Sequence, residues 1–205
     1  MPRMIARYTS GERATHWIVA VFFILAALSG LAFFHPSYFF LTNLFGGGPW
    51  TRILHPFIGL VMFFAFMAFA LRLWDVNKLT DNDRLWMKRI GDVAANRDHD
   101  LPEVGKYNAG QKYLFWLLLL CMLALVVTGF LMWRPWFAGY VPIWLNRTAV
   151  VVHALAGFGL ILLIILHIYA AIWTKGSIRA MTRGTVSEAW AKHHHPAWHR
   201  EVSGK

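Results

Sequence analysis

Four long apolar runs constrain the fold of this chain more than any other feature. They cover about residues 15–34, 53–74, 113–133 and 149–173 and contain almost no formal charge. A helix rises 1.5 Å per residue, so about 20 apolar residues cross a hydrocarbon core of roughly 30 Å. The sequence therefore predicts an all-α fold, a four-transmembrane-helix bundle forming a single domain over residues 1–205. The loop at 75–112 and the tail at 174–205 lie outside the spans.

The first run could be mistaken for a secretory signal peptide. It is about 20 residues long, contains His16 and lacks a clear small-x-small cleavage site. We therefore expect it to remain as a span. The hydrophobic fraction of 58% and the 11 tryptophans agree with a membrane protein, because tryptophans gather at membrane interfaces.

The basic residues predict the orientation of the spans. Four helices place both termini on one side, together with 17 of the 20 lysines and arginines, and only Arg52, Arg134 and Arg147 fall on the other side. Basic residues concentrate on the cytoplasmic side, so both termini should be cytoplasmic. Anionic lipid head groups account for the net charge of +10, and no nucleic acid partner is needed.

The single cysteine excludes several redox sites. Cys121 lies in the middle of the third run, where it has no second thiol in the chain for a disulfide or an iron–sulfur cluster. There is no Cys-x-x-Cys-His sequence, which excludes covalently attached c-type haem.

Four histidines lie within or at the ends of the spans, where ionisable groups are costly and usually functional. They are His16, His55, His153 and His167. His153 and His167 are 14 residues apart, so they project from nearly the same helix face and are separated by roughly 21 Å along the axis. We expect His55 to meet His153 near the outer surface and His16 to meet His167 near the inner surface.

Facing imidazoles on neighbouring helices can form the axial ligand pair of a b-type haem. Gly59 and Gly157 follow His55 and His153 by four residues, one turn along the same helix faces. A flat macrocycle bound at the histidine would lie against that turn, and glycine leaves room for it. The alternative is that these glycines only allow close helix packing. The paired pattern favours two haems, with the four histidines as haem iron ligands.

Three further features lie outside the four spans. His35 precedes Pro36 and is interpreted as a loop residue. Residues 84–95 could form an amphipathic helix on the membrane surface. The histidines between 193 and 199 could bind a metal, but an exposed tail is the favoured interpretation.

Sequence motifs along nearly the whole chain resemble those of the membrane cytochrome b subunit, the gamma subunit, of respiratory formate dehydrogenase. They are HW at 16–17, ALSG at 27–30, RILHPF at 52–57, GKYNAGQK at 105–112, WRP at 133–135, KGSI at 175–178 and WAKHHHPAWHRE at 190–201. The resemblance implies two haem b groups on the same four histidines. It also implies a site for menaquinone or ubiquinone at Asn108, Gly110 and Gln111, beside His167.

The residues of this segment are compatible with two roles. The amides of Asn108 and Gln111 can donate to a quinone carbonyl, and Gly110 would let the ring approach the backbone. Asn108 and Gln111 also have the spacing of a helix N-cap and its reciprocal partner. Both roles are compatible.

The implied function is electron transfer rather than formate chemistry, so the chain is no enzyme by itself. The resemblance implies a bacterial inner membrane, in which electrons come from a periplasmic catalytic (alpha) subunit through an iron–sulfur (beta) subunit. They would pass the outer and then the inner haem to a quinone near the cytoplasmic side. Two alternatives remain open: the anchor of another oxidoreductase such as a hydrogenase, and a haem-free transporter or channel that uses the histidines as a proton path.

Overall fold

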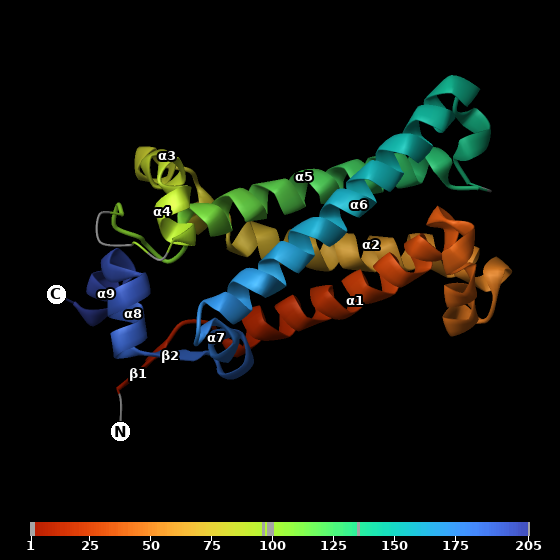
Figure 1. Cartoon of the computed structure of the whole chain (residues 1–205). Helices are drawn as coiled ribbons and strands as arrows, with labels where there is room; N and C mark the ends of the chain where they lie inside the picture. The colour runs from red at the N-terminus through yellow and green to blue at the C-terminus, as the bar shows by residue number, and fades with distance from the viewer. Residues whose placement is uncertain (1–2, 96, 98–100, 135, 205) are drawn as a thin grey trace. The chain divides into compact units, whose positions relative to one another are not determined.

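The computed structural model describes residues 3–95, 97, 101–134 and 136–204. Its four long helices are α1 (Ser10–Phe34), α2 (Gly48–Arg72), α5 (Ala109–Met132) and α6 (Ile143–Trp173) (Figure 1). Each is long and apolar enough to cross a membrane, which confirms the four predicted spans. Every helix begins before its predicted run. The first turns of α1, α2 and α5 carry mostly polar or small residues that hydropathy leaves out, whereas α6 begins with apolar residues that Asn146 and Arg147 separate from the predicted run.

Short elements join and flank the long helices. They are β1 (Met4–Ala6), η1 (Pro36–Phe45), η2 (Asp75–Asn77), α3 (Asp81–Lys88), α4 (Ile90–Ala94), η3 (Ala138–Tyr140), α7 (Ser177–Arg183), β2 (Thr185–Ser187), α8 (Glu188–His194) and α9 (Pro196–Ser203). The two strands pair antiparallel, with Ile5 opposite Val186. This ribbon is the one departure from the predicted all-α class among the described residues. His35 begins η1 as its N-cap, where its side chain accepts a hydrogen bond from the Ser37 N–H.

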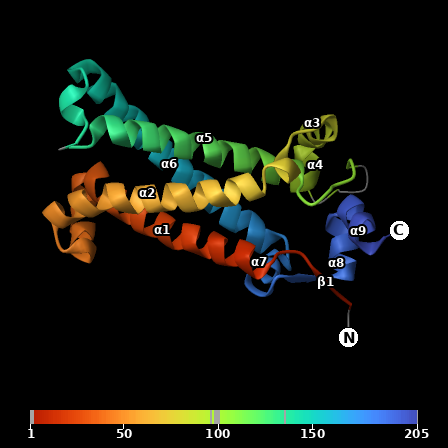
Figure 2. The same ribbon diagram turned by 180° about the vertical axis from the view of Figure 1, so that it is seen from behind.

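The chain divides into two compact units, and each is assembled from separate parts of the sequence. The first comprises residues 1–13, 71–116 and 167–205, and the second comprises residues 14–70 and 117–166. The single domain over 1–205 stays a prediction. In the second unit, α1, α2, α5 and α6 run alongside one another (Figures 1 and 2). Only 11–17% of the residues in the most apolar window of each long helix are buried, so their apolar side chains suit a lipid surrounding.

The C-terminal segment packs within the first unit and is not an exposed tail. Its core contains Ala180, Val186, Ala191 and Trp198. His195 is 3% exposed, and its ring nitrogen Nδ1 donates to the Gly105 carbonyl at 2.8 Å. The exposed-tail interpretation is therefore wrong, because the two tryptophans of the tail supply apolar surface that folds it. No group of three or more His, Cys, Asp or Glu residues within the described part of the chain could hold a metal ion.

Arg7 links three parts of the first unit. Its guanidinium is buried and donates through Nη2 to the Lys106 carbonyl at 2.6 Å and to Nε2 of His195 at 3.2 Å. It also lies 4.7 Å from the Trp198 ring and 5.0 Å from the Trp190 ring, within cation–π range. These contacts tie the N-terminal segment and the 103–107 loop to the C-terminal helices.

The predicted amphipathic helix over residues 84–95 is wrong. Two short helices, α3 and α4, occupy this region, and Arg89 between them has φ −105° and ψ 20°. Of the expected apolar face, Trp86 is buried, whereas Leu85 and Ile90 are exposed. The break at Arg89 therefore overturns a continuous helix over this range, while a position on the membrane surface stays a prediction.

We expect the C-terminal segment to undock as the pH falls. Burial, and then the nearby Arg7 charge, lower the pKa of His195 to about 3, from an unfolded value of about 6.5. Its stabilising contribution is complete above pH 6.5 and decreases as the pH falls from 6.5 toward 3, by about 2 kcal/mol between pH 6.5 and 5. Hydrogen exchange of residues 175–204, measured at pH 7 and pH 5, should therefore be faster relative to the intrinsic rate at pH 5.

Two substitutions separate this histidine from its neighbours. His195→Gln should remove most of the pH dependence of exchange, because the titrating ring is gone. His193→Gln, at an exposed position of the same segment, should leave that dependence unchanged. If hydrogen exchange depended on pH equally in the two variants, the titrating group would not be His195.

Candidate functional site

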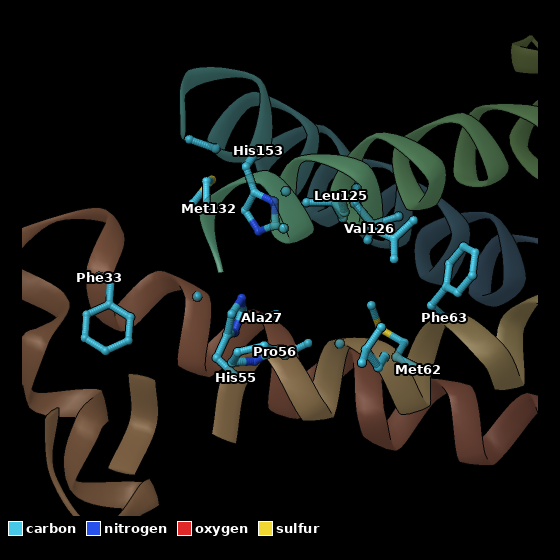
Figure 3. Close-up of a pocket in the computed structure, with 18 of the residues that line it drawn as sticks. Ala27, Phe33, His55, Pro56, Met62, Phe63, Leu125, Val126, Met132 and His153 are labelled. Carbon is cyan, nitrogen blue, oxygen red and sulfur yellow. The ribbon is translucent and has the colours of Figure 1, made fainter. Parts of the chain in front are cut away.

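An apolar cavity of about 480 Å³ lies among α1, α2, α5 and α6 within the second unit. His55 enters it from α2 and His153 from α6, and Figure 3 shows the two rings pointing toward each other across the cavity. Their ring centroids are 6.2 Å apart, and the ring planes are inclined at 73°. The structure thus brings together the two histidines that were expected to form the outer pair.

A serine on α1 sets the orientation of the first ring. The Ser29 hydroxyl donates to the Leu25 carbonyl at 2.8 Å and lies 2.8 Å from Nδ1 of His55. A hydroxyl has one hydrogen, so an oxygen that donates to a carbonyl must accept from the imidazole. The proton is therefore assigned to Nδ1, and the Nε2 lone pair is left for a metal ion.

The second ring is held in the same way by α5. The Thr128 hydroxyl donates to the Ala124 carbonyl at 2.6 Å and lies 2.8 Å from Nδ1 of His153. The same count of hydrogens places the proton on Nδ1 and leaves Nε2 available. Both rings therefore present an unprotonated nitrogen, which is the form that ligates iron.

Ser29 and Thr128 are not among the functional residues predicted from the sequence. A usable signal was present, since each precedes a glycine, and they lie 26 and 25 residues before His55 and His153. Each helical hairpin thus contains a hydroxyl residue followed by glycine, and then a histidine with a glycine four residues later.

The four glycines of this repeated pattern line the cavity. A Cβ atom at Gly30 would lie 3.3 Å from Cε1 of His55, and one at Gly129 would lie 3.6 Å from Cε1 of His153. These two glycines give the rings room. A Cβ at Gly59 would meet nothing within 4 Å, and one at Gly157 would meet only Leu125 at 3.8 Å. These two glycines hold open the space beside the histidines.

The cavity and its donors fit a metal-centred macrocycle. Two metal–nitrogen bonds of about 2.0–2.1 Å, together with the radii of the two rings, match the separation of the ring centroids. The volume of about 480 Å³ falls within the range of about 300–1,000 Å³ that is typical of ligand sites. The lining is mostly apolar, as a buried aromatic cofactor requires.

The two histidines expected at the inner depth belong to different units. His16 lies on α1 in the second unit, with its ring centroid 6.2 Å from that of Phe69 on α2. His167 lies on α6 in the part that belongs to the first unit, where it is partly buried. Their pairing stays a prediction.

The segment predicted to bind quinone forms the start of α5. The Asn108 N–H donates to Oε1 of Gln111 at 3.0 Å, and the Gln111 N–H donates to Oδ1 of Asn108 at 2.9 Å. This is a reciprocal capping arrangement, so the helix-start role is present. It occupies the side-chain oxygens and leaves the two amide NH₂ groups as donors for a further partner.

Contacts from α3 hold this turn within the first unit. A Cβ at Gly110 would lie 3.7 Å from the buried Trp86 ring, so the tryptophan packs over the glycine. The Lys112 ammonium lies 2.8 Å from Oδ2 of Asp83. Burial raises the pKa of the Asp83 carboxyl, but hydrogen bonds from Lys112 and Thr80 outweigh it and lower that pKa below its usual value. The Asp83 carboxyl therefore stays ionised at neutral pH.

Comparison with known proteins identifies the family of this chain. Over residues 7–184 the chain matches the family described as prokaryotic cytochrome b561. The chain belongs to this family. It is also similar to the cytochrome b556(fdo) subunit of formate dehydrogenase from Escherichia coli K12, with 46% identity over 97% of this chain and 93% of the relative.

Two further relatives agree. The nitrate-inducible formate dehydrogenase cytochrome b556(Fdn) subunit of Escherichia coli K12 is 44% identical over 98% of this chain and 92% of its own length. The formate dehydrogenase cytochrome b556 subunit of Haemophilus influenzae is 43% identical over 96% of this chain and 83% of its own length. The resemblance inferred from the motifs is confirmed, and membership of a cytochrome b family implies b-type haem.

We expect Gly157→Val to prevent haem binding in the cavity with little effect on the apoprotein. The new side chain would fill the space beside His153, whereas the nearest existing atom lies 3.8 Å from the added Cβ. Pyridine haemochrome assay per chain should show a loss of haem. Gly159→Val is the matched control, because Gly159 lies on the same helix but does not line the cavity. Equal haem content in the two variants would exclude this cavity as a haem site.

Proposed function

We propose that this chain is the membrane cytochrome b subunit of a formate dehydrogenase complex. It would carry electrons from an iron–sulfur (beta) subunit to a quinone, while a catalytic (alpha) subunit oxidises formate. The observation that carries this proposal is the facing pair of His55 and His153, both held with Nε2 available. The names of the three relatives support the choice of formate dehydrogenase.

Two pairs of histidines would hold two b haems. His55 and His153 would ligate the outer haem, and His16 and His167 the inner one. When bound, each haem supplies a one-electron redox centre. The excess of lysine and arginine at the termini and in the 75–112 loop supports cytoplasmic termini, so the first pair would lie toward the periplasm.

The quinone would bind at the start of α5. The amide NH₂ groups of Asn108 and Gln111 can donate to its carbonyl oxygens, because the side-chain oxygens are already engaged as helix caps. Cytoplasmic protons would complete the quinol, which is menaquinol or ubiquinol. Electrons would move inward while protons are taken up inside, and each charge moved through 100 mV corresponds to about 2.3 kcal/mol.

Histidine variants test the two haem sites in the purified complex. We expect His55→Ala to lose the outer haem and His167→Ala to lose the inner haem together with quinol formation, since each removes one axial ligand. Reduced-minus-oxidised spectra and haemochrome counts measure both. A wild-type complex without a b-type alpha band would instead favour a haem-free proton path, and co-purified subunits of a hydrogenase would overturn the assigned partners.

Conservative amide variants test the quinone site. Asn108→Asp and Gln111→Glu keep the oxygens that cap α5 but remove the NH₂ donors. Loss of one hydrogen bond of about 1.4 kcal/mol should raise the KM for quinone about tenfold. Reduction of the haems by formate should be unchanged, which serves as the internal control. An unchanged KM in both variants would place the quinone elsewhere.

A further inference from the structure

The second unit contains cations without any anion to balance them. No Asp or Glu occurs between Glu12 and Asp75 or between Glu103 and Glu188, so residues 14–70 and 117–166 carry no carboxylate side chain. The same segments contain three basic residues, Arg52, Arg134 and Arg147. Any negative charge that pairs with these arginines within this unit must come from a bound molecule or the membrane.

Two of the three arginines line the cavity between the histidines. Arg52 lies on α2 three residues before His55, on the same face of the helix, and Arg134 follows the end of α5 at Met132. Among the described residues that line the cavity, these two are the only charged ones. Arg147 does not line it.

Both arginines lie at one end of the cavity. The Arg52 guanidinium carbon is 5.8 Å from the centre of the Phe33 ring. Figure 3 shows Phe33 and Met132 at the end of the cavity away from Met62 and Phe63. Arg52 lies beside Phe33, and Arg134 follows Met132 by two residues, so both arginines belong to this end. The Arg52 guanidinium and the chain at Arg134 therefore lie toward the same end of an otherwise apolar space.

We propose that Arg52 and Arg134 bind the two propionate groups of the outer haem. This inference rests on the proposed haem site. A b-type haem carries two carboxylates on one edge of an apolar ring, and moving them next to an apolar cavity without counter-charges would be costly. Arginine is suited to this role, because its guanidinium donates two parallel hydrogen bonds to a carboxylate.

Redox titration of the complex in membranes tests the charge pairing. The ferrous haem holds one more electron than the ferric haem, so removing a nearby cation disfavours reduction. Arg52→Gln and Arg134→Gln should each lower the midpoint potential of the outer haem, and the double variant should lower it further. The outer haem is identified as the redox transition that the wild type shows and the His55→Ala variant lacks. Arg52→Lys should restore most of the potential, because it keeps the charge.

Arg147→Gln is the matched control, since it removes an arginine of the same unit that does not line the cavity. It should leave both potentials unchanged. If Arg52→Gln and Arg134→Gln give the same outer potential as Arg147→Gln, the inference is overturned while the haem site stands. A wild-type complex without the outer haem would instead overturn the proposed function.

Esterified haem gives a second, independent readout. Apoprotein from haem-limited cells is titrated with haem and with haem dimethyl ester, whose propionates carry no charge. Loss of charge-assisted hydrogen bonds should weaken binding at the outer site about ten- to a hundredfold in the wild type. The difference between the two ligands should shrink in the Arg52→Gln/Arg134→Gln variant. Equal binding of both ligands by the wild type would contradict the proposal.

Discussion

The hydrogen bond between a buried imidazole and a hydroxyl of the neighbouring helix is the interaction on which this site depends. An imidazole within an apolar span must have its N–H satisfied by the protein, because lipid offers no partner. Ser29 and Thr128 provide that partner and also donate to carbonyls of their own helices. The protons are thereby assigned to Nδ1, so His55 and His153 face each other with the nitrogen that can bind iron.

The site is built from two similar helical hairpins. Each hairpin supplies one hydroxyl, one histidine and two glycines, of which one accommodates the ring and the other leaves space beside it. Neither hairpin encloses a cavity alone. The facing pair of imidazoles therefore exists only where the hairpins meet, in a space that Arg52 and Arg134 also line.

The first unit shows how polar contacts organise residues outside the spans. Arg7 joins the N-terminal segment to the 103–107 loop and the C-terminal helices through hydrogen bonds and aromatic rings. The adjacent turn at Asn108 and Gln111 is held from α3 by Trp86 and by the ion pair of Asp83 with Lys112. These contacts place amide donors at a helix start, which is the proposed quinone site.

The sequence by itself determined the four helices, because runs of about 20 apolar residues have few other solutions. It also matched His55 and His153 in depth, since position along a helix follows from residue number. The repeated hydroxyl–glycine pair marks Ser29 and Thr128 in the sequence. Their role, however, depends on which helix face meets which ring. Nor could the sequence predict the burial of His195, because that burial follows from contacts with Arg7 and Gly105, which lie far from it in the chain. Depth and length are local properties of a helix, whereas partners, protonation and enclosed space are decided only by packing.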